Sequence, residues 1–431
     1  MAKSVKRTLL ASAAGLMAMT SVAHAGGFAV REQSTSSQGA SFAGSAAGGD
    51  LSSMFWNPAA LGASQGTNSE SHSAIFFGRT NLEADGGSLL AGGGNTSSGD
   101  IAEDAMISSS YFGHQISDSM WVGMSVNSPF GLVTKPADRN WVGAPIARSS
   151  KIFTLNAAPT LAVEVMPGVV VGAGVQVQYM DAQLKFATPT GASAVYEGDD
   201  IAFGGTLGLY LNPVEGTQIG IGYRSQVKSQ LEGDLFVVGQ PTRSPNTVEL
   251  VTPDIVTFSV RQAVSENFRL MGTFEWTNWS DFQSVSLNNL TALGAPGAVA
   301  TIEANWHDAW FASIGAEYDW SSSLTIRGGI AYEESPIQNA SERLTPVPDA
   351  DRIWASVGAT YKATSHLTID LAYTKVFVED ARFERETAVP VPALGAPGTL
   401  EGTAETDVDI LSFSVKQKLD ASHPILGGLF Q

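Results

Sequence analysis

The chain has 431 residues, of which only 15% are charged, and its formal net charge is −18. So acidic a chain lacks the basic surface that phosphate backbones require, which excludes nucleic acid as a partner. The absence of cysteine excludes thiolate metal sites, disulfides and thiol nucleophiles.

Residues 1–25 have the pattern of a secretory signal peptide. They combine a basic start (residues 3–7), an apolar run (residues 9–19) and the small-x-small cleavage site Ala23-His24-Ala25. The apolar run is too short to cross a bilayer, and no later stretch reaches the ~18–20 apolar residues that a spanning helix needs. The sequence therefore predicts an exported protein without membrane-spanning helices.

Residues 26–65 are rich in Gly, Ala and Ser and show neither strand alternation nor a helical stripe. Phe28 and Trp56 would be out of place in a free tail, and glycine permits close packing in a narrow space. Asn57-Pro58 predicts a turn, because proline restricts the residue before it. We predict that this segment is a hatch, or plug, inside a barrel; composition alone leaves open a flexible linker or a small periplasmic module.

From residue 66 onward the sequence alternates with period two, the signature of strands with two different faces. In residues 217–228 the odd positions are mainly apolar, whereas the even positions are polar or glycine. Aromatic residues gather near the predicted strand ends, and the polar faces combine charged side chains with many glycines. A polar lumen tolerates such a face and a sandwich core does not.

The pattern predicts an all-β fold, a 14-stranded antiparallel transmembrane β-barrel over residues 66–419, followed by a C-terminal extension over residues 420–431. Seven long connections alternate with six short turns, as in outer-membrane barrels whose short turns face the periplasm. The predicted strands are residues 67–82, 103–116, 119–129, 149–165, 168–184, 199–212, 215–232, 249–263, 267–280, 306–319, 323–335, 349–362, 366–380 and 405–418.

Motifs for chemistry are missing from the sequence. No two histidines have metal-ligand spacing, and neither a Walker A sequence nor a G-x-S-x-G elbow occurs. We therefore expect no metal, no cofactor and no enzymatic activity. A lipid hydrolase remains an alternative, with His114 and His307 as candidates, because a Ser/His pair can be assembled from different strands. A structural or adhesive barrel is a third possibility.

Several cations fall on the predicted lumen faces. They could bind the headgroup of an anionic ligand, since Arg and Lys complement a carboxylate. Alternatively, and for most of them in our interpretation, they pair with lumen acids. The cations are Arg224, Lys228, Arg269, Arg327 and Arg352, and the acids are Glu275, Glu317, Glu333 and Asp370.

A series of short motifs resembles the FadL family of long-chain fatty-acid outer-membrane transporters, which includes aromatic-hydrocarbon channels of the TodX type. The resemblance covers nearly the whole mature chain. The motifs in chain order are Gly27-Phe28, Gln38-Gly39-Ala40, Asn57-Pro58-Ala59, Trp141-Val142-Gly143, Leu155-Asn156 with Pro159, Gly222-Tyr223-Arg224-Ser225, Trp276-Thr277 with Trp279-Ser280, Arg327-Gly328-Gly329, Ser335-Pro336 and Asp351-Arg352 with Trp354.

The resemblance implies a barrel blocked by an N-terminal hatch, located in the outer membrane of a Gram-negative cell. It implies passive uptake of hydrophobic compounds, with long-chain fatty acids as the first cargo and aromatic hydrocarbons as the alternative. Movement of the N-terminal segment would open the path, and cargo could leave sideways at a kinked strand. The expected partners are the cargo, outer-membrane lipid and lipopolysaccharide, and the expected state is a monomer.

The resemblance also suggests roles for individual residues. Phe28 would line the ligand pocket, and Asn57, Pro58 and Ala59 would anchor the hatch and take part in gating. The cations that we predict to bind substrate are Lys185, Arg224 and Arg327.

Overall fold

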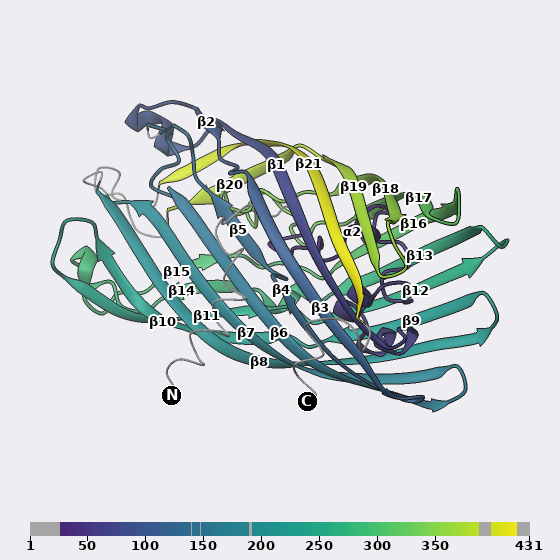
Figure 1. Ribbon diagram of the computed structural model, residues 1–431. Helices are drawn as coiled ribbons and strands as arrows, with labels where there is room; N and C mark the ends of the chain where they lie inside the picture. Colours follow the sequence, from purple (N-terminus) through teal and green to yellow (C-terminus); the bar gives the residue numbers. More distant parts are fainter. Residues whose placement is uncertain (1–25, 139, 147, 189–191, 388–397, 420–431) are drawn as a thin grey trace.

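The computed structural model describes residues 26–138, 140–146, 148–188, 192–387 and 398–419 (Figure 1). The predicted signal peptide and C-terminal extension therefore lie outside the described residues. None of the helices in these ranges is long and apolar enough to cross a membrane.

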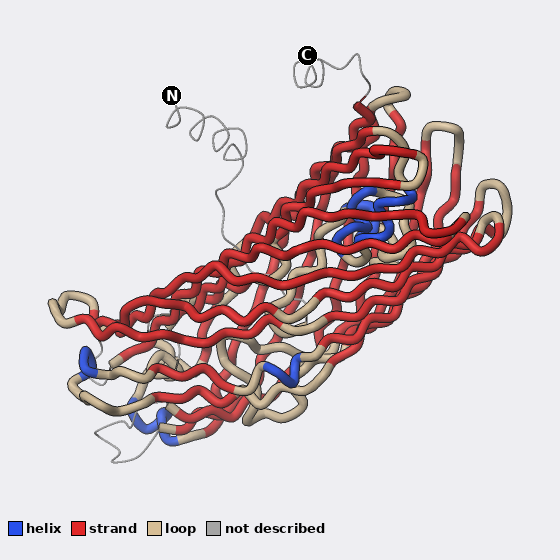
Figure 2. The backbone as a smooth tube through the Cα atoms, turned by 90° about the horizontal axis from the view of Figure 1, so that it is seen from below, coloured by secondary structure: helices blue, strands red, loops and turns tan. Residues whose placement is uncertain are grey.

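The N-terminal segment, residues 26–65, contains three short helical pieces. They are α2 (Thr35–Gln38), η2 (Leu51–Phe55) and η3 (Pro58–Ala63). The Ser34 side chain caps α2 and the Asn57 side chain caps η3, with Pro58 in the first helical position. Figure 2 shows these helical turns enclosed by the strands near one end of the molecule.

In the described ranges all strands except those of one separate hairpin form a closed antiparallel wall with fourteen strand positions, which confirms the predicted barrel. The last position closes on the first, from Thr67 opposite Leu419 to Gly86 opposite Glu401. Nine positions hold a single strand: β1 (Thr67–Gly86), β6 (Ser149–Met166), β7 (Val169–Ala187), β8 (Ser193–Val214), β13 (Phe268–Thr277), β16 (Ala309–Asp319), β17 (Leu324–Glu333), β18 (Arg352–Lys362) and β21 (Thr399–Leu419).

Each of the other five positions is interrupted and holds two strands in succession. These pairs are β2 (Ser97–Asp100) with β3 (Ala105–Ser117), β4 (Met120–Asn127) with β5 (Gly131–Thr134), β9 (Thr217–Arg224) with β10 (Val227–Val237), β11 (Arg243–Thr252) with β12 (Ile255–Ala263), and β19 (Leu367–Val378) with β20 (Ala381–Glu386). The long connections add the hairpin β14 (Ser284–Leu287) and β15 (Ala300–Glu303) and the 3-10 turns η4 (Ser88–Gly92), η5 (Trp279–Asp281) and η6 (Thr291–Leu293).

Some of the predicted strands were too short at the end that carries the long connections, whereas others were too long there, such as the predicted strand 306–319, which begins only at Ala309. β8 begins at Ser193 and β21 at Thr399, six residues earlier than predicted in each case. The pairing of neighbouring strands continues past the apolar band that the sequence pattern detects, because backbone hydrogen bonding does not require lipid on the outer face.

One predicted face is wrong. Lys228 is exposed, whereas its neighbour Val227 is buried. The interruption between β9 and β10 at Ser225-Gln226 shifts the alternation by one residue, so that odd positions point inward after it. Lys228 is therefore not a lumen cation.

The buried core lies inside the wall and the apolar exterior lies outside it. Phe42, Trp56 and Leu61 of the N-terminal segment pack in one cluster with wall residues such as Phe311 and Trp354. Large apolar side chains on the outer face remain exposed, as lipid-facing positions of a membrane barrel require.

Candidate functional site

The N-terminal segment contacts the wall at places where the wall has glycine. A β-carbon at Gly358 of β18 would lie 2.8 Å from the Cα of Gly39, closer than real β-carbons approach other atoms. A β-carbon at Gly220 or Gly222 of β9 would collide with backbone carbonyl oxygens of the segment. The polar lumen face is therefore rich in glycine because backbone meets backbone there.

The Asn57-Pro58-Ala59 element attaches the segment to β8. The Asn57 amide donates to the carbonyl oxygens of Ala46 at 2.9 Å and of Leu209 at 3.0 Å, while its Oδ1 accepts from the Ala59 amide. The side chain is completely buried. This geometry supports the predicted anchor, since one side chain joins two parts of the segment to a wall strand.

Arg224 is the last residue of β9 and contacts the N-terminal segment. Its guanidinium donates to the Phe55 carbonyl at 3.2 Å and to Oε1 of Gln176 at 2.5 Å, and it lies 4.5 Å from the centre of the Phe55 ring. Among the described residues no carboxylate forms an ion pair with it, although it is buried. Arg224 is thus a buried cation whose hydrogen bonds, in the part of the chain that the structure describes, go to neutral groups.

Residues 28–30 fill a break in the wall. β4 and β5 are separated by Ser128-Pro129-Phe130, and β5 pairs with β6 but not with β3. The Val30 amide donates to the Pro129 carbonyl at 2.8 Å, and the Gly131 amide donates to the Phe28 carbonyl at 2.9 Å. The N-terminal segment therefore supplies a piece of strand where the wall lacks one.

Gln33 fastens this piece from the lumen side. Its amide donates to the carbonyl oxygens of Val30 at 3.0 Å and of Ser128 at 2.9 Å. The main-chain carbonyl oxygen of Gln33 accepts hydrogen bonds from the hydroxyls of Ser109 and Tyr111. We did not predict this residue from the sequence, because nothing in a Gly-, Ala- and Ser-rich stretch distinguishes a Gln that bridges to a strand break.

Phe28 is enclosed in a box of aromatic rings on the side of the long connections. Its ring centre lies 4.9 Å from that of Trp279, 5.5 Å from Phe282, 5.8 Å from Trp306 and 5.9 Å from Phe130. The ring fills the box and is 1% exposed. Phe28, the predicted pocket residue, thus occupies an aromatic part of the lumen.

An ion cluster lies beside this box. Arg31 pairs with Glu275 of β13 at 2.6 Å and with Glu333 of β17 at 3.0 Å. The Gly26 amide donates to Glu333, and the Gly27 amide donates to Asp349. We did not predict a role for Arg31 from the sequence, although Arg31, Glu32 and Asp50 are the only charged residues in residues 26–65 and so had a detectable signal.

The other two predicted substrate cations lie elsewhere. Arg327 pairs with Glu317 at 3.1 Å and donates to Thr360 at 2.7 Å, which favours a role in balancing lumen charge. Lys185 is half-buried near the outer end of β7. The structure therefore does not bring Lys185, Arg224 and Arg327 together into one site.

The two candidate histidines of the hydrolase alternative are also apart. His114 contacts Thr67 next to a short turn, whereas His307 contacts Glu342 in the long connections. Within the described ranges no group of three or more acidic or histidine side chains is placed to hold a metal ion.

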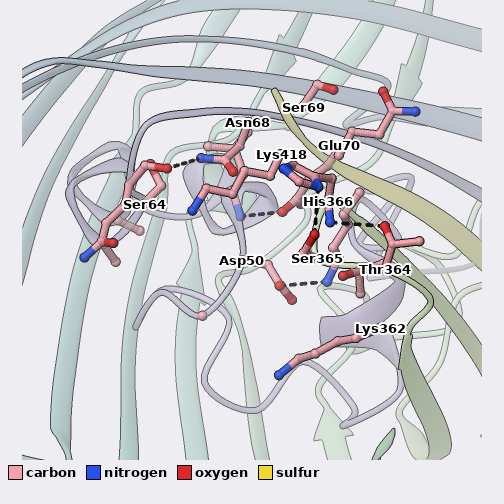
Figure 3. A pocket seen from close by; sticks show the side chains of 18 residues that line it. Asp50, Ser64, Asn68, Ser69, Glu70, Lys362, Thr364, Ser365, His366 and Lys418 are labelled. Carbon is pink, nitrogen blue, oxygen red and sulfur yellow. Dashed lines mark hydrogen bonds and ion pairs between the residues drawn. The ribbon is translucent and has the colours of Figure 1, made fainter. Parts of the chain in front are cut away.

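A polar pocket of about 490 Å³ lies where the segment meets the wall, at the end that carries the short turns (Figure 3). Asp50 of the segment pairs there with Lys416 of β21 at 2.7 Å, and Lys416 also pairs with Asp370 of β19 at 2.9 Å. Lys362 and Lys418 line the same pocket. This ion pair is a further attachment of the segment to the wall, on the side away from Phe28.

Comparison with known proteins gives one consistent result. Residues 16–418 match the family model described as outer membrane protein transport protein (OMPP1/FadL/TodX). The chain is 28% identical over 425 residues to a 47 kDa outer membrane protein of Pasteurella multocida, covering 90% of this chain and 95% of that one. It is 24% identical over 421 residues to a long-chain fatty acid transport protein of Escherichia coli, covering 87% and 92%.

Solved structures give the same fold. A FadL homologue of Pseudomonas aeruginosa superposes with a TM-score of 0.80 at 22% identity, covering 91% of this chain and 99% of that one. The toluene transporter TbuX of Ralstonia pickettii gives a TM-score of 0.66 at 15% identity, with coverages of 90% and 100%. The similarity thus extends over the barrel and the N-terminal segment together.

Proposed function

Because the chain belongs to the outer membrane protein transport protein family (OMPP1/FadL/TodX), we propose that it takes up long-chain fatty acids and that its N-terminal segment is the gate. The family consists of outer-membrane channels for hydrophobic compounds and not of enzymes. The cargo and the gate are the parts that go beyond family membership.

The main support for the gate is that residues 28–30 make two kinds of contact. They complete the wall at the break before Gly131, and they hold Phe28 in the aromatic box. Cargo that enters the box must displace Phe28, because the ring fills it. Displacement pulls on the same backbone that closes the wall, so that entry of cargo and opening of a sideways exit are coupled. No energy source is needed, since cargo moves down its own gradient.

Arg224 supports a fatty acid rather than a neutral hydrocarbon. A buried guanidinium is strongly attracted to a carboxylate, and in the described part of the chain Arg224 has none. When the segment moves, the Phe55 carbonyl leaves Arg224 and an anionic headgroup can replace it. The named functions of the relatives allow both cargoes, a fatty acid in Escherichia coli and toluene in Ralstonia pickettii.

Two experiments test the proposal. Mass spectrometry of lipid recovered from the purified protein should find long-chain fatty acids, and recovery of aromatic hydrocarbons alone would contradict that cargo. Deletion of residues 27–50 should leave a folded barrel with raised, nonspecific conductance in planar bilayers. Unchanged conductance of a folded deletion variant would contradict the gate.

A further inference from the structure

Glu32 of the N-terminal segment is a buried carboxyl group without hydrogen-bond partners. It is 3% exposed, and both of its side-chain oxygens lack a partner in the described part of the chain. An ionised carboxylate is expensive to bury unless donors or cations surround it. The surroundings of Glu32 therefore favour its protonated form.

The neighbouring cations are already engaged. The charged groups that act on Glu32 are Arg31 beside it, Glu333 on β17 and Arg352 on β18. The two guanidinium groups serve three carboxylates, which are those of Glu275, Glu333 and Asp349. The three carboxylates already outnumber the two guanidinium groups, and a fourth negative charge at Glu32 would increase this excess. Burial, opposed only in part by its backbone amide and the two arginines, raises the pKa of Glu32 to about 8.

The position of Glu32 links it to the closing contacts. Val30 and Gln33, on either side of it, bind the strand break at Ser128 and Pro129. Two further titratable side chains touch this stretch: Tyr111 of β3 donates to the Gln33 carbonyl, and His72 of β1 accepts from the Thr35 amide. Unlike Glu32, both of them have hydrogen-bond partners in the closed arrangement.

We propose that Glu32 is a positioning residue of the gate, whose protonated side chain keeps residues 26–33 seated, and that release of this stretch into water is coupled to loss of one proton. The inference rests on the proposed gate, since it requires the segment to move. The gate would then be sensitive to pH, a property that follows neither from the barrel fold nor from the proposed cargo.

The direction of the effect follows from linkage. In water Glu32 titrates near its ordinary pKa of 4.5, and in the closed state near 8. Between these values the closed state binds one more proton than the open state, so opening becomes easier as pH rises, by at most about tenfold per pH unit. Above about pH 8 the carboxyl is ionised in both states and the dependence ends.

The test is the open probability of the purified full-length protein in planar bilayers between pH 5 and 9. We expect a rise toward pH 8 followed by a plateau. Glu32→Gln should give a low value without pH dependence, because its amide carries no titratable proton. Glu215→Gln, which removes an exposed carboxylate from the turn between β8 and β9, is the matched control and should follow the unmodified protein.

Two outcomes of this measurement would overturn the inference: an unmodified protein without pH dependence, or a Glu32→Gln variant that keeps it. The variant lacking residues 27–50 separates this failure from failure of the gate. High conductance of that variant at every pH shows that the gate exists, so a flat profile of the unmodified protein then counts against Glu32 alone.

Infrared spectroscopy of the unmodified protein adds a measurement that does not depend on folding of the variant. A protonated carboxyl band should be present at pH 7 and lost above pH 8, and its absence at pH 7 would contradict the proposal.

Discussion

The contact between Gly39 of the N-terminal segment and Gly358 of β18 offers a direct test of the gate. Both glycines have backbone angles that alanine adopts without strain, so Gly358→Ala acts through added volume, and the nearest atom that it meets belongs to the segment. The new β-carbon would lie 2.8 Å from the Cα of Gly39, whereas ordinary contact needs 3.4 to 4 Å. The segment must therefore retreat by roughly 1 Å or the wall must bend.

Overpacking of this size costs about 1–3 kcal/mol, because close-packed interiors do not yield freely. Since the open state does not contain this contact, the cost falls on the closed state and raises the ratio of open to closed protein by about 5- to 150-fold. The assay is open probability in planar bilayers, with gel mobility before and after heating as the check that the barrel is folded.

Gly272→Ala is the matched control, because a β-carbon there meets nothing nearer than 3.6 Å. It should leave open probability unchanged. If Gly358→Ala is folded and as closed as the control, the segment is not seated by close approach of backbone and the reasoning fails.

Three further changes probe other contacts of the segment. Arg224→Ala should reduce uptake of oleate and spare uptake of toluene in cells, and equal loss of both would mean that Arg224 only supports the fold. Asp50→Asn should raise basal conductance by about tenfold or more, since hydrogen bonds to charged groups contribute about 1.5–3 kcal/mol and Lys416 would keep only Asp370; a conductance equal to that of the unmodified protein would contradict this. Phe28→Ala should empty the aromatic box, so that cargo no longer has to displace a ring, and should raise the amount of fatty acid retained per protein during purification, whereas unchanged retention would place the ligand elsewhere.

The sequence predicted the barrel well because its signal is repeated in every strand. Alternation with period two, two loop lengths and a polar inner face each constrain the fold, and all three agree. The same reasoning identified the N-terminal segment by exclusion, since residues 26–65 are the ones that do not alternate. Asn57-Pro58-Ala59 was detectable as well, because the turn signal is local.

The site was harder to predict because its parts come together only in space. The Gln33 side chain donates a hydrogen bond to the main-chain carbonyl oxygen of Ser128, and neither residue type indicates that contact in the sequence. Lys228 shows the same limit within one strand. The two-residue interruption at Ser225-Gln226 reverses the faces that follow, and no local signal in the sequence gives the side of the wall on which a strand resumes.

The distribution of attachments indicates which part of the segment moves. Beyond the ion cluster, the stretch from Gln38 to Ala46 is held by single neutral hydrogen bonds, such as those from Ser41 to Ser356 and from the Ala46 amide to Ser259. Each contributes only about 0.5–1.5 kcal/mol, because water replaces it when the contact opens. Asn57 instead makes three hydrogen bonds through its buried side chain, and the chain continues into β1 shortly after it. Once the ion cluster at Arg31 and the aromatic box release the N-terminal end, the stretch up to Ala46 should therefore follow readily, and opening should end at Asn57, which stays attached to β8 as the hinge.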